Sequence, residues 1–295
     1  MKNTYMQKLF HKILVIAFFG LLVQVTPALA QITAHQVTAR LPDVDRVTNV
    51  SNNWAGYVAT GGSFTSVTGS WIVPEVNATQ TSADATWVGI GGTTHNDLIQ
   101  TGTQAIVNNN GRISYQAWYE MLPGNSRKIP LSINPGDSIT ASIVQQSTNQ
   151  WTISLRDDTT GQNYQTTVTY ASSLSSAEWI EEMPVLGRSF IPLDNFGSVQ
   201  FSALSTVKDG KALTPAQANA HTIVMDNYLG QALAQPSALG SDGASFTVSR
   251  TDSTSSQAGW RRAVTGIHGH QPFHRQGRGR FSSGFNKLPE NYRIT

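Results

Sequence analysis

Three carboxyl groups stand within five residues of an otherwise apolar segment, SAEWIEEMPV (Ser176 to Val185). Its Trp, Ile, Met and Val residues predict a buried β-strand, in which successive side chains point to opposite faces of the sheet. Glu178 and Glu182 then share one face, and Trp179 and Glu181 share the other. Because Trp179 prefers the core, we expect Glu178 and Glu182 on the outer face, where a groove could lie and carboxyl groups could transfer protons.

A second segment, ISYQAWYEML, shows the same alternation. Gln116, Trp118 and Glu120 share one face, opposite Tyr115 and Tyr119. An aromatic side chain beside a carboxyl group is compatible with a binding surface. The alternative is ordinary packing between strands, with Glu120 solvated. The alternation by itself leaves both interpretations open.

The residue types present exclude several other chemistries. Cysteine is absent, which excludes a thiol nucleophile and a cysteine-ligated zinc site. The sequence contains no H-E-x-x-H motif, no P-loop, no G-x-S-x-G elbow and no D-[TS]-G loop. The predicted folded region contains only His95 and His221, and three further histidines (His268, His270 and His274) stand in a tail without a carboxylate partner. We therefore predict no metal site, and carboxyl and amide groups on strands remain.

The first 30 residues have the pattern of a secretory signal peptide. A lysine-containing start precedes an apolar run of thirteen residues, Ile13 to Val25, and small residues stand before a cleavage site near Ala30. This run is shorter than the about 20 residues that cross a bilayer as a helix. We therefore predict a secreted protein, extracellular or periplasmic, with no membrane attachment after cleavage.

Charge divides the remaining chain into three parts. Residues 31–48 form a short polar lead, either a pro-segment or a flexible arm. Residues 49–252 carry 8 Lys and Arg against 15 Asp and Glu, a net charge of −7, and such a domain lacks the basic face that nucleic acid requires. Residues 253–295 are Gly- and Arg-rich with a net charge of +6, and we expect a disordered tail.

Short runs rich in Val, Ile, Thr, Tyr and Trp recur throughout residues 49–252, separated by turn sequences such as NNNGR, NPGDS and DDTTGQ. Many short strands at regular spacing predict an all-β sandwich or barrel. One segment, LTPAQANAH (Leu213 to His221), predicts a short helix. A domain of about 200 residues can rely on its apolar core without disulfides, which is compatible with the absence of cysteine.

Five motifs occur in an order that resembles one enzyme family, the glutamic peptidases, also called eqolisins. They are SNNWAGY (Ser51 to Tyr57), ATWVGIGG (Ala85 to Gly92), LIQTGTQ (Leu98 to Gln104), YQAWYEMLP (Tyr115 to Pro123) and AEWIEE (Ala177 to Glu182). Each motif alone is weak, but all five in this order and spacing make a strong signal, which covers roughly residues 53–227.

The resemblance implies a fold and a catalytic pair. The family fold is an antiparallel β-sandwich, lectin-like, of two sheets of about seven strands each, with the catalytic cleft on the concave outer face of one sheet. The family's glutamine, in the L-Q-T-G motif, corresponds to Gln100, and its glutamate, which closes the A-E-[WF]-I-x-E motif, corresponds to Glu182. The glutamate takes a proton from water and returns it to the leaving amine, while the glutamine stabilises the oxyanion. No metal or organic cofactor is implied, and activity is expected at acidic pH.

Further site residues follow from the same motifs. Trp54 and Trp87 correspond to tryptophans that line the family's substrate groove, although each could instead be a core residue. Glu120 and Trp118 are expected near the cleft. One departure is Gly91, which stands where the fungal enzymes usually have an aspartate and leaves the pH optimum and the subsite preference open.

Three functions are compatible with these residues. The leading hypothesis is a secreted, monomeric acid endopeptidase that acts on polypeptides. A sandwich glycoside hydrolase could use a carboxyl pair such as Glu120 and Glu182, but it gives no reason for Gln100 in its motif. A secreted glycan- or protein-binding module could use the tryptophans as a platform. The peptidase hypothesis requires Gln100 and Glu182 to face each other.

Overall fold

A computed structural model describes residues 37–38, 49–93, 95–186 and 189–251. The predicted signal peptide (1–30) and the predicted tail (253–295) lie outside these residues, as does the predicted lead (31–48) apart from residues 37–38. Within the described ranges, no helix is long and apolar enough to cross a membrane.

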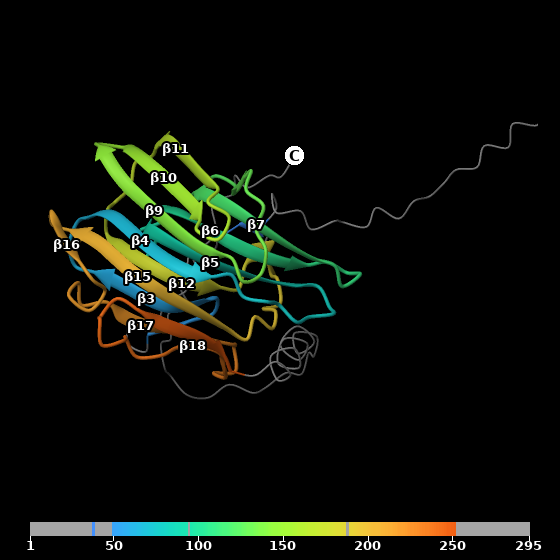
Figure 1. Ribbon diagram of the computed structural model, residues 1–295. Coiled ribbons are helices and arrows are strands. Elements are labelled where there is room, and N and C mark those ends of the chain that lie inside the picture. Colours follow the sequence, from blue (N-terminus) through green and yellow to red (C-terminus); the bar gives the residue numbers. More distant parts are fainter. Residues whose placement is uncertain (1–36, 39–48, 94, 187–188, 252–295) are drawn as a thin grey trace, which may run out of the picture.

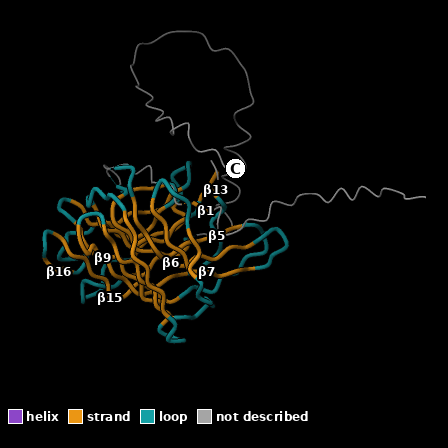
Figure 2. Tube along the Cα trace, turned by 90° about the horizontal axis from the view of Figure 1, so that it is seen from above, coloured by secondary structure: helices purple, strands orange, loops and turns teal. Residues whose placement is uncertain are grey.

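The described chain consists of β-strands joined by turns and loops (Figures 1 and 2). In chain order the strands are β1 (Val37–Thr38), β2 (Val50–Ser51), β3 (Trp54–Thr60), β4 (Phe64–Ile72), β5 (Ser82–Gly91), β6 (Leu98–Val107), β7 (Ile113–Met121), β8 (Arg127–Ile129), β9 (Ser138–Ser147), β10 (Gln150–Asp157), β11 (Asn163–Thr169), β12 (Ser176–Glu182), β13 (Val185–Leu186), β14 (Ser189–Phe190), β15 (Ser198–Lys208), β16 (Lys211–Leu213), β17 (His221–Asp226), β18 (Ala232–Pro236) and β19 (Phe246–Arg250). Among these strands, every pairing is antiparallel except the short contact between β2 and β17. The predicted all-β antiparallel class is confirmed.

Fourteen strands follow one continuous order, β11-β10-β9-β4-β15-β19-β18-β17-β3-β12-β5-β6-β7-β8. The prediction of two separate sheets is therefore wrong, and the reason lies in β17. Its first residues, His221 to Ile223, pair with β3, whereas Met225 and Asp226 pair with β18. One strand thus belongs to both halves and joins them into a single sheet.

The sheet folds back on itself, so that β4, β9 and β15 contact β5, β6 and β12 (Figure 1). Two indoles bridge these layers. Trp179 Nε1 on β12 donates to the Thr68 carbonyl oxygen on β4 at 2.9 Å, and Trp71 Nε1 on β4 donates to Thr103 Oγ1 on β6 at 2.9 Å. The interior holds the main apolar cluster, which includes Trp179 as the alternation predicted. We call the side of β5, β6 and β12 that faces this interior the core face.

The opposite side of the same strands carries a second apolar cluster, and we call it the site face. Its apolar members are Trp54, Val58, Ala85, Trp87, Leu98, Trp118, Leu122, Ile180 and Ile223. Ile180 follows Trp179 and points the other way, so β12 is buried on both of its faces. Burial of each large apolar side chain contributes about 1.5–3 kcal/mol, so the site face stabilises the fold as well as carrying polar groups.

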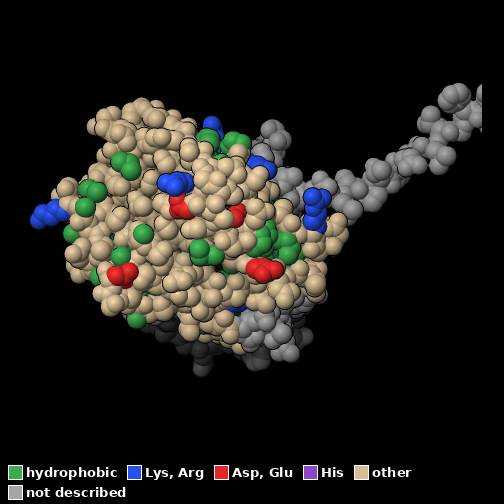
Figure 3. Space-filling model, in the orientation of Figure 1, with side chains coloured by type: hydrophobic (Ala, Val, Ile, Leu, Met, Phe, Trp, Pro, Cys, Tyr) green, Lys and Arg blue, Asp and Glu red, His purple; other side chains and the backbone are tan. Residues whose placement is uncertain are grey.

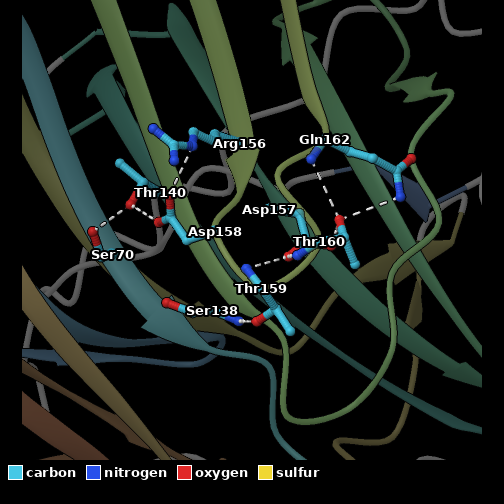
Figure 4. Close-up of polar contacts among 9 residues, drawn as sticks. All are labelled: Ser70, Ser138, Thr140, Arg156, Asp157, Asp158, Thr159, Thr160 and Gln162. Atoms are coloured by element: carbon cyan, nitrogen blue, oxygen red, sulfur yellow. Dashed lines mark hydrogen bonds and ion pairs between the residues drawn. The ribbon is translucent and has the colours of Figure 1, made fainter.

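Few charged side chains stand on the surface of the layer behind the site (Figure 3). Serine and threonine residues recur along its strands β9 and β10. Ser70 Oγ and Thr140 Oγ1 lie 2.8 Å apart, Thr140 also donates to Asp158 at 2.6 Å, and Arg156 forms an ion pair with Asp158 at 2.9 Å (Figure 4). These contacts are local to β4, β9 and β10. None of the predicted site residues lies on this layer, which therefore supports the site from behind.

The predicted helix at Leu213 to His221 is not formed. The segment makes one tight turn, in which Ala218 N–H donates to the Thr214 carbonyl oxygen at 2.9 Å, and Asn219 follows with a left-handed φ of 56°. A single turn gains too few hydrogen bonds to offset the cost of nucleating a helix. The strands β16 and β17 hold both ends of the segment and override its helical composition.

Candidate active site

Register decides which polar side chains meet on the site face. Across β12, β5, β6 and β7, one row of paired residues consists of Glu178, Gly89, Gln100 and Glu120. Paired residues of neighbouring strands project from the same face, with about 4.8 Å between strands. Glu178 and Gln100 therefore have Cα atoms about 10 Å apart, and only Gly89 stands between them.

Gly89 keeps the space between these two side chains open. A Cβ atom at Gly89 would lie 2.8 Å from Cζ3 of Trp87 and 3.0 Å from Cδ1 of Leu98. A larger residue would collide with the indole and would also place its own side chain between the carboxyl and amide groups. The glycine therefore lets Glu178 and Gln100 face each other across β5.

The Gln100 amide is oriented by Glu120. Its Nε2 donates to Glu120 Oε2 at 2.8 Å, and both residues are fully buried. The Oε1 atom of Gln100 has no hydrogen-bond partner among the described residues. Because a side-chain amide nitrogen carries two N–H groups, this contact fixes the amide and leaves its second N–H for a ligand.

Glu178 combines full burial with two carboxyl oxygens that have no hydrogen-bond partner in the described part of the chain. Burial raises the pKa of its carboxyl group well above the usual value, the nearby Ser176 hydroxyl opposes part of this shift, and the negative charge of Asp97 adds to it. Unpartnered buried polar atoms are costly, so they mark a place where a ligand contact is expected. Glu178 thus has the properties of a residue that exchanges protons during a reaction.

Glu182 stands on the site face as predicted, but in a different row. It lies four residues from Glu178 along β12, which is about 13 Å at about 3.3 Å per residue. Trp87 Nε1 donates to its Oε2 at 2.8 Å, and Asn53 Nδ2 donates to its Oε1 at 3.0 Å. The structure does not bring the expected pair, Gln100 and Glu182, opposite each other. The alternation along one strand was correct, but it could not supply the register between strands.

The three predicted groove tryptophans, Trp54, Trp87 and Trp118, belong to the site face and not to the interior between the layers. Trp54 and Trp87 meet edge to face, with ring centroids 4.8 Å apart and an interplanar angle of 77°. The indole N–H groups of Trp54 and Trp118 are buried without a partner among the described residues. These two donors suit a ligand that presents carbonyl oxygens to the site face.

A pocket opens beside Glu120. Its volume is about 300 Å³, and it is lined by Tyr119, Glu120, Met121, Gly124, Asn125, Ser126 and Arg127. These residues belong to the end of β7, the turn that follows and the start of β8. Because Glu120 is the last member of the row that contains Glu178 and Gln100, the pocket adjoins one end of that row.

Comparison with known proteins decides the family. The sequence profile of the Peptidase A4 family matches residues 52–261. The chain belongs to this family. The A4 chain is 30% identical to aspergillopepsin-2 of Aspergillus niger over 204 residues, which cover 60% of this chain and 71% of that protein. It is 30% identical to scytalidopepsin B of Scytalidium lignicola over 191 residues, which cover 60% and 72%. The resemblance seen in the motifs is confirmed.

Two solved structures are similar to the fold of this A4 peptidase. Scytalido-glutamic peptidase with a peptide-based transition state analogue gives a TM-score of 0.60 at 27% identity, over 68% of this chain and 98% of that chain. Aspergilloglutamic peptidase from Aspergillus niger gives 0.52 at 29% identity, over 58% and 99%. The protein is accordingly an enzyme, an endopeptidase of the glutamic type.

The core face of this A4 peptidase carries a second group of acids, Asp84, Glu181 and Asp194, which we call the core acids. All three are buried. Glu181 Oε2 accepts a hydrogen bond from Thr86 Oγ1 at 2.6 Å, and Asp84 Oδ1 accepts one from the Ala105 N–H at 2.9 Å. The alternation predicted the inward direction of Glu181 and could also have located Asp84 on β5. No sequence signal points to Asp194, which lies in the loop after β14.

Burial raises the pKa of every core acid. The pKa of Asp84 rises to about 6, and those of Glu181 and Asp194 rise well above their usual values. The charge of Asp84 raises the last two further, while the Arg250 guanidinium opposes part of the effect at Asp194. The core acids are therefore protonated in acid, and their ionisation at neutral pH is opposed by both burial and repulsion.

Across the described residues, no group of three or more His, Cys, Asp or Glu side chains is arranged to hold a metal ion. His95 is exposed in the loop before β6, and His221 is half-buried at the start of β17. The tail histidines, His268, His270 and His274, lie outside the described residues.

Proposed function

We propose that this enzyme hydrolyses peptide bonds of polypeptide substrates in acid with Glu178 and Gln100 as its catalytic pair. The observation that carries the proposal is their register, in which the two side chains face each other across Gly89 on a buried face. Both residues also carry polar atoms without partners among the described residues. Family membership supports the reaction class, and the register favours Glu178 over Glu182 as the glutamate.

Glu178 acts first as a general base. Its ionised carboxylate takes a proton from a water molecule, whose oxygen attacks the scissile carbonyl carbon. Gln100 Nε2 donates one N–H to the oxyanion that forms, while its other N–H remains on Glu120. The protonated Glu178 then gives its proton to the leaving amine, the C–N bond breaks, and the carboxylate is restored. These steps need no group beyond the two side chains and water.

The raised pKa of Glu178 suits both halves of this reaction. A group accepts and returns a proton most effectively when its pKa lies near the working pH. A carboxyl group that is fully buried and beside another negative charge reaches that condition at a higher pH than an exposed glutamate. We therefore expect the rate to rise with pH along an acid limb as Glu178 ionises, with the midpoint of that limb above the pKa of an exposed glutamate.

Glu182 has a positioning role in this proposal. Since both of its oxygens accept hydrogen bonds, it fixes the Trp87 indole against the row of Glu178 and Gln100. The free indole N–H groups of Trp54 and Trp118 bind carbonyl oxygens of an extended polypeptide that lies along the site face. This face would then form the substrate cleft that the resemblance implies.

The proposal includes export of the enzyme, on the basis of the signal-peptide pattern in residues 1–30, and a monomeric state. The glycoside hydrolase hypothesis is not favoured, because the chain belongs to a peptidase family. Of the carboxyl pair that it would use, Glu182 accepts hydrogen bonds from Trp87 and Asn53, and Glu120 accepts one from Gln100.

The test uses the full-length chain and four variants: Glu178→Gln, Gln100→Ala, Glu182→Gln and Glu181→Gln. The last is a matched control, since it makes the same change on the opposite face of the same strand. Each protein is incubated with denatured haemoglobin from about pH 2 to pH 7, a range that spans the titration of a carboxyl group. Tryptophan fluorescence checks that each variant is folded.

We expect Glu178→Gln to lower the rate by about 10²- to 10⁴-fold and Gln100→Ala to lower it by about 10²- to 10³-fold. Glu182→Gln should cost about tenfold through a displaced Trp87, and Glu181→Gln should stay near the wild type. Loss of activity in Glu182→Gln with full activity in Glu178→Gln would restore the pair that the motif alone implies and refute the proposed one. A folded wild-type chain that is inert at every pH would contradict the proposed function itself.

A further inference from the structure

The space beside Gly91 on β5 is filled by a side chain from further along the sequence. Gly91 has a left-handed φ of 91°, and a Cβ atom added to it would lie 2.7 Å from the Asp97 carbonyl oxygen and 2.9 Å from Asp97 Oδ2. Positions 87, 89 and 91 alternate onto the site face. The Asp97 carboxyl group therefore lies against the end of β5, close to the row that contains Gly89.

Asp97 also connects the two strands that carry the proposed catalytic pair. Its Oδ2 accepts a hydrogen bond from the Ser173 N–H at 2.6 Å. Asp97 directly precedes β6, three residues before Gln100, and Ser173 precedes β12, five residues before Glu178. A single side chain thus ties together the entries of β6 and β12, which flank β5 on its two sides.

The second oxygen of this carboxyl group, Oδ1, is buried and has no partner among the described residues. A carboxylate that only needed to hold the Ser173 N–H could be replaced by a neutral acceptor without loss. An additional buried oxygen beside the site is costly unless its charge or a ligand contact has a use. This observation separates Asp97 from an ordinary loop-fixing residue.

We propose that Asp97 is a positioning residue of the active site, which aligns β6 with β12 and places a negative charge beside Glu178. The proposal rests on the proposed function, because it assigns Asp97 a task only if Glu178 exchanges protons. A like charge favours the protonated form of a neighbouring carboxyl group. The charge of Asp97 does raise the pKa of Glu178, in addition to the larger effect of burial.

Other titratable groups surround Glu178 on the packed strands. His221 on β17 and Glu120 on β7 lie in its register row, beyond Val58 and Gln100 respectively, and Glu182 lies four residues along β12. Burial lowers the pKa of His221, which opposes its protonation. Glu120 and Glu182 both accept hydrogen bonds from neighbouring side chains.

The test measures the pH dependence of kcat/KM in the full-length chain and in Asp97→Asn, which keeps an oxygen acceptor for the Ser173 N–H but removes the charge. If Glu178 must be ionised to act, the midpoint of the acid limb follows its pKa. Removing a like charge lowers that pKa, so we expect the acid limb to move down by about one pH unit. Asp97→Ala, which also loses the tie, should show the same shift with a lower rate at every pH.

Asp97→Ser is a second neutral variant whose oxygen can accept the same N–H, and it replaces Asp97→Asn if that variant does not fold. Glu75→Gln is the matched control, since it removes one exposed carboxyl group away from the site, and its profile should overlay the wild type. Acid limbs of the Asn and Ser variants that overlay the wild type would overturn the proposal. The proposed function fails separately, when the wild type is inert or Glu178→Gln remains active.

Discussion

The two faces of β12 carry carboxyl groups that are equally buried but differently surrounded. On the site face, Glu182 accepts two hydrogen bonds from side-chain N–H groups, and Glu178 faces an amide across a glycine. On the core face, Glu181 accepts one hydroxyl hydrogen bond and otherwise meets the core acids Asp84 and Asp194. Burial therefore does not distinguish Glu178, which we propose to be catalytic, from Glu181 on the core face. The groups that surround each carboxyl group distinguish them.

The same comparison explains how one strand can tolerate three buried acids. A protonated carboxyl group is a neutral hydrogen-bonding group and is far less costly to bury than a carboxylate. In acid, both faces of β12 therefore hold neutral or hydrogen-bonded groups. At neutral pH the positive charge of Arg250 compensates part of the negative charge that Asp194 would carry.

The largest expected effect follows from raising the pH. The folded state raises the pKa of Asp84 from 3.8 to about 6, so the folded chain binds this proton more tightly than the unfolded chain. The contribution of Asp84 to the free energy of unfolding is fully present below about pH 4 and is lost as the pH rises through about 6. This contribution is about 3 kcal/mol for Asp84 alone. Glu181, Asp194 and Glu178 act in the same direction.

Urea unfolding of the full-length chain at several pH values, followed by tryptophan fluorescence, measures this loss. We expect the free energy of unfolding to fall steadily from acid to neutral pH. A free energy that is constant, or higher at neutral pH, would show that the core acids do not titrate as their burial implies.

A smaller effect is expected from replacing one acid on each face of β12, Glu181 on the core face and Glu178 on the site face. Glu181→Gln keeps an oxygen acceptor for the Thr86 hydroxyl but cannot ionise, so it should stabilise the chain at neutral pH by about 1–3 kcal/mol and leave its stability in acid nearly unchanged. Glu178→Gln should also gain stability at neutral pH, but at the expense of activity. Urea unfolding and haemoglobin cleavage are measured on both variants. A folded Glu181→Gln variant without activity would break the division between the faces.

The smallest effect is expected on the outer layer. Arg156 and Asp158 form an ion pair in which the two side chains are 62% and 33% exposed. Exposed pairs contribute little because solvent screens them, so Arg156→Ala should change the free energy of unfolding by less than about 0.5 kcal/mol and leave activity unchanged. Urea unfolding checks this change, and a loss of more than about 1 kcal/mol would mean that this layer supports the site more strongly than its contacts indicate.

The sequence predicted what depends on periodicity along a single strand. The inward direction of Trp179 and the outward directions of Glu178 and Glu182 follow from a period of two residues, and the structure confirms them. Register between strands depends on turns and on partners far away in the chain, so the row that joins Glu178 to Gln100 was beyond reach. The prediction that Glu182 is the partner of Gln100 came from the motif, which carries no information on this register, and it stays a prediction that the Glu178 and Glu182 variants test.

A motif also cannot show when a side chain from another part of the chain lies beside one of its positions. The motif comparison indicated that Gly91 removes an acid near the cleft, because it compares residues only at matching positions. In the folded chain, the Asp97 carboxyl group lies against that glycine. The single order of strands was missed for a similar reason, since nothing in the sequence of β17 states that its two ends pair with different neighbours.

The continuous order of strands has a consequence for self-association. Two separate sheets of seven strands would expose four edge strands, each able to pair with another chain, whereas the fourteen-strand order ends only at β11 and β8. The short strands β1, β13 and β14 form a small sheet of their own. β8 is three residues long and carries the exposed side chains of Arg127 and Lys128. A short edge strand with charged side chains is a poor template for pairing with another chain. The edge at β8 is therefore protected against aggregation.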